Sequence, residues 1–87
     1  MDYKFLKKVL DQILSETRID YRGRGKIFTP FILSHFLIST FTIHYSSYRS
    51  NFFNHCKNVY GLNEEESKYV WEEYKRIIKD KIDNNGL

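Results

Sequence analysis

A loop rich in arginine and glycine is the segment of this sequence with the clearest capacity for chemistry. Residues 18–26 read RIDYRGRGK and hold four cations and two glycines. Glycine lets the backbone approach an anion closely, guanidinium groups offer paired donors to phosphate, and tyrosine can stack on a base. The spacing matches neither the P-loop nor the dinucleotide-binding pattern. The sequence predicts either a solvated turn or phosphate and nucleic-acid contacts through Arg18, Tyr21, Arg22, Arg24 and Lys26.

The single cysteine and the three histidines are the other residues with catalytic or metal-binding chemistry. A cysteine nucleophile needs a base and an orienting carboxylate, but a helix would turn His55 away from Cys56, and residues 27–48 contain no acidic side chain. A structural zinc site needs four ligands at paired spacings, which the candidates lack. These candidates are His35, His44, His55 and Cys56. We therefore expect no enzymatic activity, no metal and no cofactor, and we interpret Cys56 as a small core residue.

Aromatic residues are unusually frequent in this chain. Seven Phe, seven Tyr and one Trp make up 17% of its 87 residues. A domain of this size can hardly enclose all of them together with its aliphatic residues, so we expect some at the surface, where they would bind a partner. The densest group follows Phe41 and could equally belong to the core. We expect it to form a protein interface, in a homo-oligomer or with a partner protein, through Tyr45, Tyr48, Arg49, Phe52 and Phe53.

Two amphipathic helices are predicted at the ends of the sequence. Residues 3–17 and 63–83 both place apolar side chains at the three- and four-residue spacing of one helix face. Asp2 is a suitable N-cap for the first helix, and Asn63 with Glu66 forms a capping-box pattern for the second. Both apolar faces need a common core between them.

The segment between these helices is free of charged residues from 27 to 48 and is ambiguous between helix and strand. Thr29 and Pro30 are good residues for the start of a helix, so we predict a helix at 30–41. The alternation of threonine, aromatic and β-branched residues at 40–46 is instead typical of a strand. We expect the first half of the segment to supply the core.

Three further elements complete the predicted organisation. Residues 42–49 are expected to form a turn or irregular link, followed by a helix at 50–60 that Gly61 ends in a left-handed conformation. The two glycines of the Arg/Gly loop favour a short hairpin within residues 19–28.

Two other classes of protein are disfavoured by composition and charge. A membrane span is not expected, because ten of the 22 residues from 27 to 48 are Ser, Thr, His or Pro. A helix-turn-helix at 52–76 would push three consecutive glutamates, residues 64–66, toward DNA phosphates. A lone cysteine and the absence of a signal segment at the N-terminus predict a cytoplasmic location.

Residues 1–87 are therefore expected to form a single, mostly α-helical domain, a small bundle of three to four helices. The alternative is an α+β domain with a short hairpin or strands within residues 19–46. Its expected function is that of a small non-enzymatic interaction protein that acts through exposed aromatic residues. The alternative function is nucleic-acid binding through the loop at 18–26, which a net charge of +3 favours only weakly.

Overall fold

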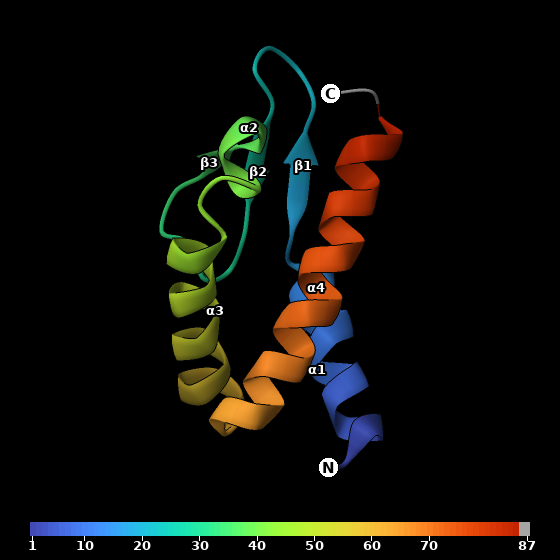
Figure 1. The fold of residues 1–87 in the computed structure, drawn as a ribbon, viewed down its shortest axis with the longest axis vertical. Coiled ribbons are helices and arrows are strands. Elements are labelled where there is room, and N and C mark those ends of the chain that lie inside the picture. The colour runs from blue at the N-terminus through green and yellow to red at the C-terminus, as the bar shows by residue number, and fades with distance from the viewer. Residues whose placement is uncertain (86–87) are drawn as a thin grey trace.

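The longest helix, α4, is the element on which the other helices pack (Figure 1). The computed structural model describes residues 1–85, in which α4 spans Glu64–Asn84. The predicted capping box is present at its start: the Asn63 side chain accepts a hydrogen bond from the backbone N–H of Glu66, and the Glu66 carboxylate accepts one from that of Asn63. The carboxylates of its first turn lie at the positive end of the helix dipole. These local signals explain why α4 begins where the sequence predicts.

The first helix, α1 (Tyr3–Ser15), confirms the prediction at 3–17 but ends slightly earlier. The Asp2 side chain caps it by accepting a hydrogen bond from the backbone N–H of Phe5, at 3.1 Å. One face of α1 is buried against α4 and carries Leu6, Val9, Leu10 and Ile13.

A three-stranded antiparallel sheet follows α1, which confirms the predicted hairpin and adds a third strand. Its strands are β1 (Arg18–Asp20), β2 (Lys26–Phe28) and β3 (Phe36–Leu37), in that spatial order. Ile19 pairs with Ile27, and Ile27 pairs with Phe36, so one face of the sheet is apolar and lies against the core. The alternation within each strand leaves the opposite face to solvent.

The predicted helix at 30–41 is wrong. Residues 30–35 form turns and bends, Phe36–Leu37 is strand β3, and only the short helix α2 (Ile38–Phe41) lies within the predicted range. The strand-like alternation at 40–46 is also misleading, because the strand of this segment lies before it.

Tertiary packing explains this difference. The Thr29 hydroxyl does accept a hydrogen bond from the backbone N–H three residues later, at 3.1 Å, but the turn does not continue into a helix. The ring of Phe31 packs against Phe52, with centroids 5.2 Å apart, while Phe36 stacks on Tyr48 at 4.2 Å. Burial of these rings in separate parts of the core therefore stabilises the segment more than the hydrogen bonds of a helix would.

Helix α3 (Tyr45–Tyr60) contains the predicted helix at 50–60 but begins earlier, so the predicted link at 42–49 is too long. Its N-terminal boundary residue, His44, makes no side-chain capping bond, which explains why no sequence signal marked this start. At its other end Gly61 adopts a left-handed conformation with φ of 67°, as predicted.

The core contains mostly aliphatic residues, but its bulkiest side chains are aromatic. Its largest fully buried side chains are Trp71, Tyr74, Phe41 and Phe52, which come from α2, α3 and α4. Residues 1–85 thus form a mostly helical single domain with four helices, which confirms the predicted fold class, and the small antiparallel sheet lies within the range that the alternative gave for strands. Within residues 1–85, no helix combines the length and the apolar character needed to cross a bilayer.

Two glycines of the β1–β2 turn differ in their contact with Ile38 of α2, and substitutions at both test how the hairpin packs against that helix. Gly23 and Gly25 both have positive φ, at 60° and 78°. A Cβ added at Gly25 would lie 2.5 Å from Cδ1 of Ile38, whereas a Cβ added at Gly23 would have no atom within 4 Å. We expect Gly23→Ala to lower the free energy of unfolding by about 1 kcal/mol through backbone strain alone. We expect Gly25→Ala to lower it by about 2–3 kcal/mol, because Ile38 must also move. Urea denaturation measures both, and equal losses would contradict the proposed docking contact.

Candidate functional site

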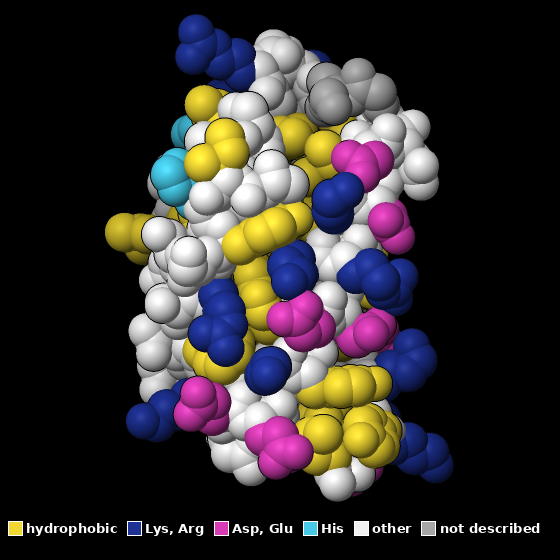
Figure 2. All heavy atoms as spheres, in the orientation of Figure 1, with side chains coloured by type: hydrophobic (Ala, Val, Ile, Leu, Met, Phe, Trp, Pro, Cys, Tyr) yellow, Lys and Arg dark blue, Asp and Glu magenta, His cyan; other side chains and the backbone are white. Residues whose placement is uncertain are grey.

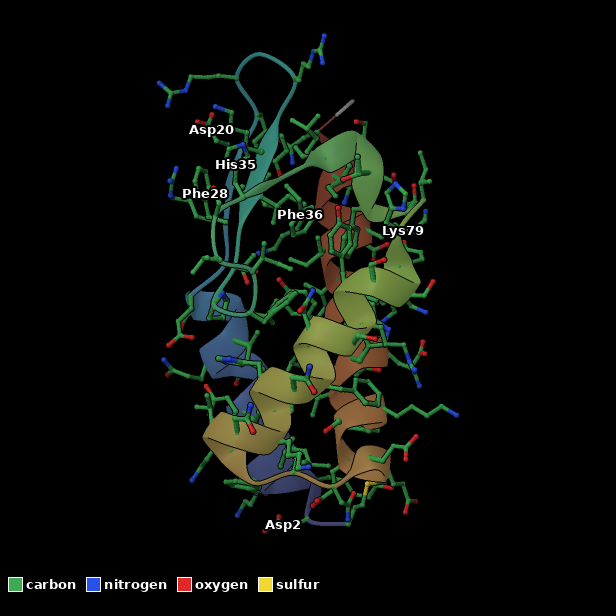
Figure 3. The ribbon with its side chains drawn as sticks, turned by 90° about the vertical axis from the view of Figure 1, so that its left-hand side faces the viewer. Asp2, Asp20, Phe28, His35, Phe36 and Lys79 are labelled. Carbon is green, nitrogen blue, oxygen red and sulfur yellow. The ribbon has the colours of Figure 1, made fainter. Side chains whose placement is uncertain are left out.

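The solvent face of the sheet brings together cationic and aromatic side chains. Arg18 lies directly opposite Phe28 in the β1–β2 register, and its guanidinium carbon is 4.1 Å from the centre of the Phe28 ring. The ring of His35 lies on the other side of β2, with its centroid 5.6 Å from that of Phe28. Figure 3 shows Phe28 and His35 on the outer side of the sheet and Phe36 on the side of the helices. Arg18, Phe28 and His35 therefore form one continuous row, which we call the sheet-face cluster.

Lys26 extends this cluster toward the tip of the hairpin, and Arg24 lies beyond it in the turn. Lys26 belongs to the same face as Phe28, which lies two residues further along β2, and it pairs with Asp20 of β1 and Leu37 of β3. Arg24 is exposed in the β1–β2 turn, where it lines a pocket together with residues of α2 and α4 and is not part of the solvent face of the sheet. Neither side chain forms an ion pair within the described residues. Both cations are therefore accessible to an anionic partner.

Arg22 has a different role from its neighbours in the loop. Its Nε and one terminal nitrogen donate to the two carboxylate oxygens of Asp20 at 3.0 and 2.9 Å, and its backbone N–H donates to the same carboxylate. These hydrogen bonds hold the pKa of the Asp20 carboxyl well below its usual range. Arg22 thus neutralises the one carboxylate on this face and shapes the turn.

Tyr21 does not belong to the sheet-face cluster. Its hydroxyl lies at the C-terminal end of α4, where it accepts a hydrogen bond from the Asn85 side chain at 3.1 Å and donates a long one, 3.5 Å, to the carbonyl oxygen of Lys81. The sequence-based hypothesis that Tyr21 stacks on a base therefore lacks support from the geometry. Phe28 and His35 are instead the aromatic side chains on the solvent face of the sheet. The alternation of side chains along the predicted hairpin places Phe28 on the same face as Lys26, so the sequence contained a signal for Phe28.

Carboxylates are absent from the central part of the sequence that carries most of this face. Residues 21–63 contain no Asp or Glu, while they contain five cations, Arg22, Arg24, Lys26, Arg49 and Lys57. Apart from Asp20, the acidic residues belong to α1, α4 and the residues that cap them. Half of the chain therefore presents no carboxylate that would repel an anion.

The predicted aromatic interface lies mostly in the core instead. Phe52 is fully buried, so its side chain is not on the surface of this protein. Tyr45, Tyr48 and Phe53 are only partly exposed and pack against the buried cluster. Arg49 remains closer to the surface, with its guanidinium carbon 4.3 Å from the centre of the Phe53 ring. The alternative interpretation of this group, as part of the core, fits the structure better.

Cys56 and the histidines do not assemble into a reactive centre. Cys56 is buried, and burial raises the pKa of its thiol to about 12. Burial also lowers the pKa of His55, whereas His35 and His44 lie on exposed parts of other segments. In the part of the chain that the structure describes, no three His, Cys, Asp or Glu side chains gather as metal ligands do.

The ion pair between Arg22 and Asp20 leads us to expect that the stability of the fold depends on pH. Because the pKa of Asp20 in the folded protein lies below its ordinary value, the pair stabilises the fold above that ordinary pKa, and the contribution is lost as the pH falls. We expect Arg22→Gln to raise the pKa of Asp20 toward its ordinary range, as followed by NMR of the carboxyl carbon. Arg24→Gln, which removes a cation without a bond to Asp20, should leave it nearly unchanged. A pKa that is insensitive to Arg22 would contradict the pairing.

The burial of the Cys56 thiol leads us to expect low reactivity toward alkylating reagents. At pH 8 a thiol with a pKa near 12 is almost entirely protonated, so we expect iodoacetamide to alkylate Cys56 about a thousandfold more slowly than an unperturbed cysteine. Unfolding in urea should restore the ordinary rate. Mass spectrometry of timed samples measures both rates. Fast labelling of the folded protein would show that Cys56 is activated, and the catalytic interpretation would then regain support.

Comparison with protein-family models, with curated proteins and with solved structures found no match to this chain.

Proposed function

We propose that this protein is a non-enzymatic binding protein and that its partner is a single-stranded nucleic acid that lies across the solvent face of the sheet. The observation that carries this proposal is the sheet-face cluster, in which the Arg18 guanidinium, the Phe28 ring and the His35 ring lie side by side next to Lys26. Bases can stack on aromatic rings and on guanidinium planes, while phosphates pair with the flanking cations.

The size of the face supports a single strand. Neighbouring strands lie about 4.8 Å apart, so three short strands offer a surface about 10 Å wide, enough for two or three nucleotides. The unpaired bases of a single strand expose the faces that aromatic side chains require, whereas a duplex hides them. RNA is the abundant single-stranded partner in the cytoplasm, the location expected for a chain with one cysteine.

The charge of the face supports an anionic partner of modest affinity. Arg18 and Lys26 on the face and Arg24 in the adjacent turn would neutralise about three phosphates, which corresponds to a slope of about −2 in a plot of log affinity against log salt concentration. The Asp20 carboxylate does not oppose this, because Arg22 already neutralises it. We expect weak binding that becomes measurable at low salt.

Neutralisation of the face tests the electrostatic part of the proposal. We expect Arg18→Gln with Lys26→Gln to weaken binding of a fluorescent poly-U oligonucleotide at least tenfold at about 50 mM salt and to reduce the salt slope from about −2 to about −0.7. The matched control is Arg49→Gln with Lys57→Gln, which removes the same charge from α3. Fluorescence anisotropy measures the affinities. Equal losses in both variants, or no binding by the wild type at this salt concentration, would refute the proposal.

Replacement of the ring tests the stacking part. Phe28→Leu keeps an apolar side chain on the solvent face of the sheet but removes the aromatic surface, and we expect a loss of about 1 kcal/mol in binding, or about fivefold, with an unchanged salt slope. Circular dichroism confirms that the variant is folded. If Phe28→Leu binds like the wild type, stacking on this ring makes no contribution.

A further inference from the structure

An exposed pair of tyrosines, Tyr3 and Tyr69, connects the first turn of α1 with the second turn of α4. The side chains of Tyr3 and Tyr69 retain 56% and 38% of their accessible surface, although their rings contact each other edge to face with centroids 5.1 Å apart. Met1, next to this pair in sequence, is also half exposed. Figure 2 shows hydrophobic side chains gathered at this lower end of the molecule. Large apolar side chains that cluster on a surface commonly mark an interface.

The charges beside the tyrosine pair differ in sign between its two sides. On α1, Lys4, Lys7 and Lys8 follow Tyr3 closely. On α4, Tyr69 has glutamates three and four residues away in both directions, which places them around it on the helix surface. These are Glu65, Glu66, Glu72 and Glu73. Several of these charges are already paired within the chain, Lys7 with Asp11, Glu72 with Lys75 and Glu73 with Arg76. Among the described residues, Lys4 and Lys8 on the α1 side and Glu65 on the α4 side form no ion pair, so these are the charges that the patch offers to a partner.

We propose that the tyrosine pair is the centre of a symmetric interface with a second copy of this chain. In a twofold arrangement, the tyrosines of one copy pack on those of the other, and the lysines of α1 face the glutamates of the partner's α4. A partner with a uniformly acidic or basic surface would be repelled by one half of the patch. The surface is therefore complementary to itself rather than to a polyanion.

The dimensions of the patch set the expected affinity. A stable interface buries about 800 Å² on each partner, which is about one seventh of the 5590 Å² that this protein exposes. The two tyrosines cannot supply that area alone, so the charged flanks must take part. We expect a dimer with a dissociation constant in the micromolar range, sensitive to salt.

This inference does not depend on nucleic-acid binding. The sheet lies at one end of the long axis of the molecule, and the first turn of α1 lies at the other (Figure 1). The tyrosine pair and the sheet-face cluster share no residue, so variants of one surface leave the other intact. Failure of either proposal is therefore recognised separately.

Removal of the tyrosines is the first test. In sedimentation equilibrium at about 100 µM protein, we expect the wild type to show a mass well above the 10.6 kDa monomer. We expect Tyr3→Ser with Tyr69→Ser to return it to the monomer mass. Leu33→Ser, which alters a fully exposed apolar residue in the loop before β3, is the matched control and should keep the mass of the wild type. A monomeric wild type at about 500 µM, or a tyrosine variant with the wild-type mass, would overturn the proposal.

Exchange of charges is the second test and is specific for a second copy. We expect Lys4→Glu with Lys8→Glu to be monomeric, and Glu65→Lys to be monomeric as well, because each variant repels itself. An equimolar mixture of the two should dimerise again, since each copy then meets opposite charge. Near-ultraviolet circular dichroism of the buried Trp71 confirms that each variant is folded. Dimerisation of either variant alone, or a mixture that stays monomeric, would contradict the twofold arrangement.

Discussion

The packing of aromatic rings on one face of α4 is the interaction on which the rest of the structure depends. Trp71 lies 5.1 Å from Phe52 of α3 and 6.4 Å from Phe41 of α2, measured between ring centres, and Tyr74 lies 5.6 Å from Phe31 of the preceding loop. The Tyr74 hydroxyl also forms a hydrogen bond of 2.8 Å with Thr17, which ties down the end of α1. Beside the buried aliphatic residues, these large rings add apolar area to a core that a chain of 87 residues would otherwise keep small.

This use of aromatic residues determines where binding surfaces can lie. The aromatic rings between residues 41 and 53 are buried or pack against the core. Aromatic side chains therefore reach solvent mainly at the two ends of the molecule. At one end the sheet turns Phe28 and His35 outward beside cations. At the other end Tyr3 and Tyr69 meet between helices of opposite charge. The sheet face is cationic, whereas the tyrosine pair lies between charges of both signs, and we therefore propose different partners for the two surfaces.

The elements that the sequence predicted well are those whose signals are local. Asp2, the capping box at Asn63 and the left-handed Gly61 each act within a few residues, and each lies where expected. The segment at 30–41 was not predictable in this way, because its conformation depends on Phe31 and Phe36 finding rings far away in the sequence. The candidate site was predicted in part: Arg18 and Lys26 share one face as an interface would need, whereas the inward turn of Tyr21 depends on its contact with α4.

That contact of Tyr21 has a consequence for the order of folding. The β1–β2 hairpin can form from nearby residues, but its tip is held by Asn85 and Lys81, which lie at the far end of the sequence. During synthesis the hairpin leaves the ribosome well before these residues do, so it can exist only as a loosely attached ribbon until α4 is complete. The sheet face should acquire its final position late, as the last helix closes over the chain.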